Sequence, residues 1–128
     1  MDKVQYWVDL CDYDFKVAKS MLESKHYLYV GFMCHQVVEK GFKAIIAELG
    51  EIPPKIHDLQ KLATQGQVFD KLSEEQFVLL DILKPLNIEA RYPEMKGKIS
   101  QTLSFERCVE LIKETEDLLC WIKQQLGK

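Results

Sequence analysis

Helical spacing of the apolar residues constrains the fold most, and it is clearest in the segment 35–44 and its flanks. At 100° per residue, four apolar residues cluster about one direction and should face a core: Val38, Phe42, Ile46 and Leu49. His35, Glu39 and Lys43 follow one another at four-residue intervals along the border of that stripe. A half-buried acid between two basic groups is costly unless it is paired. The segment therefore predicts either a structural ion pair packed on the core or one wall of a polar cleft.

The same helical period continues through the chain, and no segment has the alternation of a strand. We expect four main helices, over 2–24, 26–49, 74–90 and 105–126, with a short helix over 57–65 and a loop over 93–103. Gly41 inside the second helix predicts close approach of another helix, and Ser73 with Gln76 forms a capping box before the fourth. Pro85 predicts a kink or break. The fold class is thus all-α, an up-and-down four-helix bundle with additional short helices.

Length and charge limit the classes of protein that this chain can represent. At 128 residues we expect one domain over 1–128, large enough to fold without a metal or a disulfide. A net charge of −3 gives no electrostatic footprint for nucleic acid at the level of the whole chain. No apolar run approaches the roughly 18 residues of a membrane span, and the first residues lack a signal-peptide pattern. We therefore expect a cytoplasmic protein.

Motifs for metals and cofactors are missing. The four cysteines are widely spaced, without CxxC or zinc spacing, and each lies in an apolar helical pattern, so we expect buried thiols. There is no HExxH, no repeated ExxH pair of a di-iron bundle, and no GxxxxGK[ST] or GxGxxG loop for phosphate. The sequence predicts no metal and no cofactor.

A set of polar residues falls at positions that the pattern marks as inward or junctional: Asp14, His35, Glu39, Lys43, His57, Asp58, Arg91 and Tyr92. Asp14 lies in the apolar stripe of the first helix and needs a cation or backbone donors from another element. Arg91 next to Tyr92 can hold a phosphate and stack on a base. The alternative is that Arg91 pairs with Asp14 or Glu39 and pins the helix ends. Likewise, His57 could serve only as a capping or loop hydrogen bond, and Tyr92 as a packed turn residue.

Several short motifs in this order resemble the HEPN family (higher eukaryotes and prokaryotes nucleotide-binding domain). They are Asp14-Phe15, the Gln-x-x-Glu-Lys-x-x-Lys-Ala segment over 36–44, Pro53-Pro54, His57-Asp58-Leu59 and Ala90-Arg91-Tyr92-Pro93. The resemblance extends from Trp7 to the last helix. It matches Glu39 and Lys43 to the acid-x(3)-base pair of the family's second helix, and Asp14 to the acidic position of the first.

The resemblance implies a prokaryotic cytoplasmic homodimer, often paired with a minimal nucleotidyltransferase in a two-component module. Many relatives are RNA-cutting toxins that carry Arg-x(4–6)-His near the final helix. Here no histidine follows Arg91, so the base of that motif is missing, and His35 or His57 would have to replace it.

These residues and the resemblance are compatible with three functions. The first is a module that binds a nucleotide or an RNA phosphate through Lys43, Arg91, Tyr92 and His57, with Asp14, Glu39 and Asp58 as a structural polar network. It would act with a nucleotidyltransferase partner in a toxin–antitoxin-like system. The second is a divergent metal-independent endoribonuclease, with His35, His57 and Arg91 as candidate catalytic residues. The third is a purely structural or interaction role.

Overall fold

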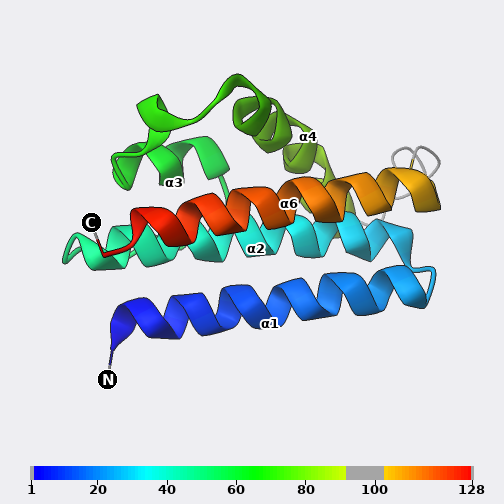
Figure 1. The fold of residues 1–128 in the computed structure, drawn as a ribbon, viewed down its shortest axis with the longest axis horizontal. Coiled ribbons are helices and arrows are strands. Elements are labelled where there is room, and N and C mark those ends of the chain that lie inside the picture. The colour runs from blue at the N-terminus through cyan, green and yellow to red at the C-terminus, as the bar shows by residue number, and fades with distance from the viewer. Residues whose placement is uncertain (1, 92–102, 128) are drawn as a thin grey trace.

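The computed structural model describes residues 2–91 and 103–127, apart from the side chain of residue 89, and most of them are helical. Within them are five α-helices, one 3₁₀ turn and no strand (Figure 1). The elements are α1 (Lys3–Glu23), α2 (Tyr27–Glu48), α3 (Leu59–Gln65), η1 (Phe69–Lys71), α4 (Glu74–Arg91) and α6 (Phe105–Gln125). The predicted all-α fold is confirmed, and the predicted loop over 93–103 falls almost entirely outside the described residues.

Capping side chains set several of the helix boundaries, as the sequence indicated. The Ser73 hydroxyl accepts the backbone N–H of Gln76 at 3.1 Å, and the Gln76 side chain accepts the backbone N–H of Ser73 at 2.8 Å. This is the predicted capping box of α4. Ser104 caps α6 in the same way, by accepting the backbone N–H of Arg107. Side-chain acceptors thus satisfy backbone donors that have no partner within the helix.

Two details of the predicted helices are wrong. The short third helix begins at Leu59 rather than at His57, because the Asp58 carboxylate accepts the backbone N–H groups of Gln60 and Lys61 and so forms the N-cap. His57 consequently precedes the helix. Of the kink or break predicted at Pro85, the break is absent, since α4 continues to Arg91. Burial of the apolar face around it, with Leu83 and Leu86, outweighs the one hydrogen bond that proline removes.

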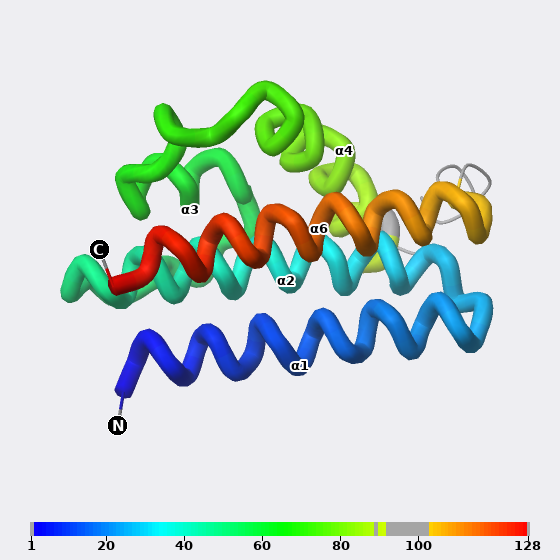
Figure 2. The backbone as a smooth tube through the Cα atoms, viewed as in Figure 1, coloured from blue at the N-terminus to red at the C-terminus, as the bar shows by residue number. Residues whose placement is uncertain are grey.

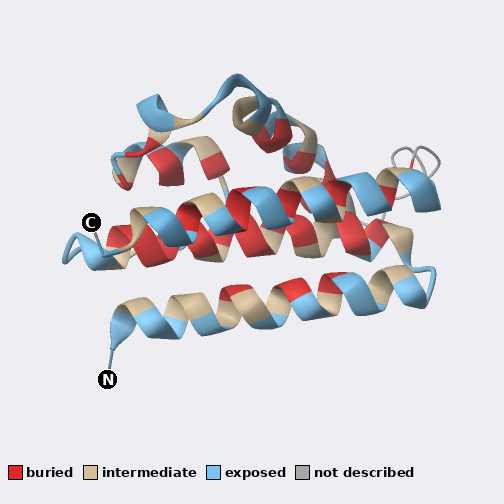
Figure 3. Cartoon of the chain, viewed as in Figure 1, coloured by how far each residue is buried: buried red, intermediate tan, exposed pale blue. Residues whose placement is uncertain are grey.

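Helix α2 occupies the centre of the molecule and packs against α1, α3, α4 and α6. It lies beside the long helices α1 and α6, while α4 is inclined to all three (Figures 1 and 2). Fourteen of its 22 residues are buried, against three of 21 in α1 (Figure 3). A helix with neighbours on most sides has no broad solvent face, so its polar residues are enclosed as well.

Close packing around α2 depends on glycine. A Cβ atom at Gly41 would lie 2.9 Å from Cδ1 of Ile122 in α6, and one at Gly31 would lie 2.8 Å from Cδ1 of Leu86 in α4. The predicted close approach at Gly41 is therefore confirmed. The last member of the predicted apolar stripe, Leu49, lies beyond the end of α2 and is 44% exposed, so its assignment to the core was wrong.

Candidate functional site

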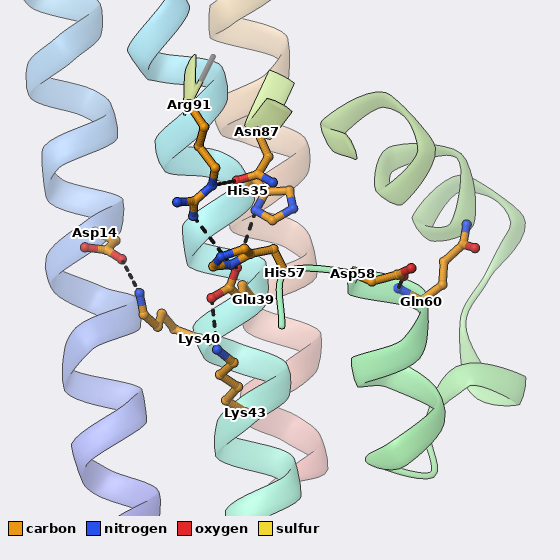
Figure 4. Close-up of polar contacts among 10 residues, drawn as sticks. All are labelled: Asp14, His35, Glu39, Lys40, Lys43, His57, Asp58, Gln60, Asn87 and Arg91. Atoms are coloured by element: carbon orange, nitrogen blue, oxygen red, sulfur yellow. Dashed lines mark hydrogen bonds and ion pairs between the residues drawn. The ribbon is translucent and has the colours of Figure 1, made fainter. Parts of the chain in front are cut away.

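A buried carboxylate on α2 is the centre of the polar cluster. The predicted border residues His35, Glu39 and Lys43 are all buried. Lys43 Nζ donates to Glu39 Oε2 at 3.1 Å, and His57 Nδ1 lies 2.9 Å from Glu39 Oε1 (Figure 4). His57 reaches this point because the connection from α2 to α3 returns along α2 (Figure 2). Two elements far apart in sequence thereby meet at one carboxylate.

The charge of Glu39 determines which atom of His57 carries a proton. Burial alone would raise the pKa of Glu39, but the hydrogen bonds from His57 and Lys43 outweigh it and lower the pKa below its ordinary value. The ionised carboxylate only accepts, so the proton of the 2.9 Å contact belongs to His57 Nδ1. The neutral ring then has Nε2 as an acceptor. This is the arrangement in which a carboxylate orients a histidine as a base.

Arg91, the last residue of α4, is exposed and held in place by two neighbours. Its Nε donates to Asn87 Oδ1 at 2.9 Å, and its guanidinium carbon lies 5.3 Å from the centroid of the Phe32 ring. Its Nη2 is 3.4 Å from His57 Nδ1. That nitrogen already directs its proton to Glu39, so the Arg91 contact is not a hydrogen bond in this tautomer. Among the described residues, the terminal N–H groups of the guanidinium have no hydrogen-bond acceptor and can therefore meet a ligand.

His35 lies beside a concavity with an unsatisfied ring nitrogen. It is 1% exposed, and burial lowers its pKa to about 4, so the ring is neutral at pH 7. Its Nδ1 has no hydrogen-bond partner among the described residues, and Glu39 Oε1 is 3.8 Å away. With His57 it lines a concavity of about 160 Å³, whose other walls come from the start of α3 and from α4, including Lys84 and Asn87. A buried polar atom without a partner at such a wall is typical of a site that receives water or a ligand.

The structure separates the predicted polar network into three parts. Asp14 pairs with Lys40 of α2 at 3.7 Å, so it has the cation that its position required, although burial raises its pKa. Asp58 caps α3 and does not contact Glu39. Arg91 contacts Asn87 and His57, so the predicted pairing with Asp14 or Glu39 is wrong. Tyr92 lies outside the described residues.

Three residues of the site were missed by sequence reasoning: Phe32, Lys40 and Asn87. Asn87 precedes Arg91 by four residues on one helix, and that spacing is a usable signal. Lys40 and Phe32 contact partners on other helices, so no local pattern indicates them.

The cysteines show no sign of a reactive or metal-binding site. Cys11, Cys34 and Cys108 are buried as predicted, but Cys120 is exposed, which corrects the expectation for the fourth thiol. Burial raises the pKa of the Cys34 thiol to about 12, so it is not a nucleophile at neutral pH. Within 2–91 and 103–127, His, Cys, Asp and Glu form no cluster of three or more that could hold a metal ion. In the same part of the chain, no helix combines the length and apolar character of a membrane span.

Comparison with known proteins agrees with this architecture. The crystal structure of TT1696 from Thermus thermophilus superposes with a TM-score of 0.85 at 17% identity, over 98% of this chain and 100% of that one. ST0689, described as an archaeal HEPN homologue, gives 0.67 at 22% identity, over 98% of both chains. These identities establish the fold alone. No curated protein is similar enough in sequence to count as a match. The HEPN domain family model matches residues 4–125, nearly the whole chain, and this protein therefore belongs to the HEPN domain family.

Proposed function

We propose that this chain is a binding module that takes a nucleotide or an RNA phosphate at the Arg91 site, defined by Arg91, His57 and Glu39. The observation that carries the proposal is the exposed Arg91 guanidinium, fixed by Asn87 and Phe32 beside a carboxylate-oriented histidine. We further propose that it acts as a cytoplasmic homodimer with a nucleotidyltransferase partner in a toxin–antitoxin-like module. Membership of the HEPN family supports nucleotide binding and a dimer.

The chemistry of the site favours a phosphate. A guanidinium offers planar, paired N–H donors that match two phosphate oxygens, and Phe32 and Asn87 reduce the conformational freedom lost when it binds. Lys84, in the wall of the adjacent concavity, adds a second cation. Lys43 has a different role from the one expected, because its ammonium is buried against Glu39. We assign Lys43 to holding Glu39, and through it His57, in position.

Calorimetric titration with adenosine and uridine monophosphates tests the proposal. Arg91→Ala should weaken binding about tenfold to a hundredfold, the range for losing charge-assisted hydrogen bonds. Arg107→Ala is the matched control, because that guanidinium already pairs with Glu110 at 2.9 Å and Glu114 at 3.3 Å on α6. Equal affinity in wild type and Arg91→Ala would remove Arg91 from the site. If the wild type binds neither monophosphate, the site does not take a mononucleotide.

The Glu39–His57 pair supports a second candidate, a metal-independent endoribonuclease. His57 Nε2 would take the proton of a ribose 2′-hydroxyl, whose oxygen would attack the adjacent phosphorus. The 5′-oxygen would leave and take a proton from solvent, while Arg91 stabilises the charge gained by the phosphate oxygens. His35, the other candidate base, fits poorly because it is 1% exposed and its burial lowers its pKa to about 4.

Labelled RNA incubated in EDTA tests this candidate. Cleavage should disappear in His57→Ala and in Arg91→Ala, and it should persist in His26→Ala, which changes an exposed histidine at the start of α2. Cleavage that survives His57→Ala would assign the activity to another base or to a contaminating nuclease.

A further inference from the structure

A second and larger concavity lies between the start of α1 and the segment 51–55. Its volume is about 480 Å³. Its apolar lining includes Tyr6, Trp7, Ile52 and Pro53, and two lysines, Lys3 and Lys55, line it as well. We call this concavity the Trp7 groove. Glu51 also lines it, and that carboxylate accepts a hydrogen bond from the Gln65 side chain at 3.1 Å.

The apolar residues of the Trp7 groove are unusually accessible. Ile52 is 84% exposed and Tyr6 is 48% exposed. The Tyr6 and Trp7 rings meet edge to face, with their centroids 5.1 Å apart. Large apolar side chains gathered around a concavity mark a binding surface rather than ordinary solvent exposure. The combination of aromatic faces and ammonium groups suits a planar base attached to a phosphate.

A chain of contacts joins the Trp7 groove to the Arg91 site. Lys43 Nζ lies 5.5 Å from the centroid of the Trp7 ring and 3.1 Å from Glu39, which His57 contacts in turn. Figure 4 shows His57, Glu39 and Lys43 following one another along one face of α2, with α6 behind that helix. A strip of residues along α2 therefore connects the walls of the two concavities.

The length of this strip indicates how large a ligand could occupy both ends. Phe32, beneath Arg91, and Ala47, in the lining of the Trp7 groove, are fifteen residues apart on α2, which is about 22 Å of helix. A stacked strand advances about 3.4 Å per nucleotide, so the strip matches about six stacked nucleotides and fewer extended ones. A mononucleotide could fill only one end.

We propose that the Trp7 groove is a base-stacking subsite that continues the Arg91 site, so that the ligand is a single-stranded oligonucleotide. This inference rests on the proposed function, because it takes the phosphate at Arg91 as one end of the ligand. Stacking on Tyr6 and Trp7 tolerates any base, and Lys3 and Lys55 face the backbone of the strand. An apolar peptide would use the same aromatic rings, but it would leave the lysines and the guanidinium without partners.

The test compares ligand lengths in the full-length protein. In a Trp121→Phe background, Trp7 is the only tryptophan and reports on the groove. Octauridylate should quench its fluorescence and bind at least tenfold more tightly than uridine monophosphate. Ile52→Asp and Lys55→Glu should each weaken octauridylate binding fivefold or more and leave monophosphate binding unchanged. Both side chains are exposed, so neither change threatens the fold. Val109→Asp and Lys113→Glu, the same changes at exposed positions of α6, are the matched controls.

Several outcomes would overturn the subsite. One is equal affinity of the wild type for octauridylate and uridine monophosphate. Another is octauridylate binding by the groove variants that is no weaker than binding by the α6 controls. If sedimentation shows that Ile52→Asp separates a wild-type dimer without changing octauridylate affinity, the groove is a contact between copies of this chain. If the groove variants bind octauridylate as the wild type does, while Arg91→Ala loses monophosphate binding, the subsite is wrong and the proposed function is retained. Octauridylate binding that depends on Ile52 but not on Arg91 would overturn the Arg91 site and keep the groove.

Discussion

Replacing Glu39 by glutamine should destabilise the fold by about 3 kcal/mol. The Glu39 side chain is 3% exposed and its Lys43 partner 8% exposed. A glutamine amide offers one oxygen in place of two, so either Lys43 or His57 loses its acceptor. Removing one partner of a buried ion pair costs about 3–5 kcal/mol. We expect the lower end, because the His57 side chain is 47% exposed and water can replace its bond.

The exposed pair Asp12–Lys123 is the matched control. Its nitrogen–oxygen distance is 2.7 Å, shorter than the 3.1 Å of Lys43–Glu39, but its side chains are 45% and 43% exposed. Asp12→Asn should therefore cost less than about 1 kcal/mol. If distance rather than burial decided the strength of an ion pair, the order of the two variants would be reversed.

Urea unfolding at pH 7 measures both losses, provided that the slope of free energy against urea is the same in all variants. The double variant Glu39→Gln with Lys43→Met should regain part of the lost stability, because it removes the buried ammonium left without a counter-charge. Equal losses in Asp12→Asn and Glu39→Gln would show that burial does not set the strength of these ion pairs.

Three further predictions follow from other parts of the structure. His35 is protonated near its ordinary pKa of 6.5 in the unfolded chain, but only near 4 in the folded chain. The free energy of unfolding should therefore fall by about 3 kcal/mol as the pH drops from 6.5 to 4. The lowered pKa of Glu39 acts in the same direction at lower pH. The urea midpoint of the wild type should fall between pH 7 and 4.5, and that of His35→Leu should fall less. An equal fall in the variant would contradict the role of His35. A thiol reagent should label one cysteine of the native protein quickly, Cys120, and the other three only on unfolding; two rapidly labelled thiols would be inconsistent with the burial described. Asp58→Ala should cost about 1 kcal/mol through loss of the α3 cap, whereas Asp58→Asn should keep most of it, and thermal unfolding of the two variants distinguishes them.

Local patterns were sufficient to predict the helices. Apolar spacing and the capping groups at Ser73 and Ser104 depend on neighbours in sequence, so α4 and α6 began where expected. The break predicted at Pro85 does not occur, because packing of the surrounding leucines decides whether a helix continues through a proline.

The candidate site was predicted only in part. Glu39 between two basic groups on α2 could be recognised, but its burial was underestimated, because a helical projection of one helix does not show how many others surround it. The His57 contact depends on a connection that returns along α2, and the Arg91 contacts depend on where the end of α4 rests. Neither path leaves a periodic signal in the sequence.

The position of α2 divides the Arg91 site into residues that the scaffold fixes and residues that it leaves open to change. Glu39 and His35 belong to the helix on which the other described α-helices pack, so a substitution there disturbs the architecture as well as the site. His57 precedes α3 and Arg91 ends α4, and both side chains are exposed. A chain built in this way can exchange its base or its cation, and hence its chemistry, while the framework that presents them stays intact.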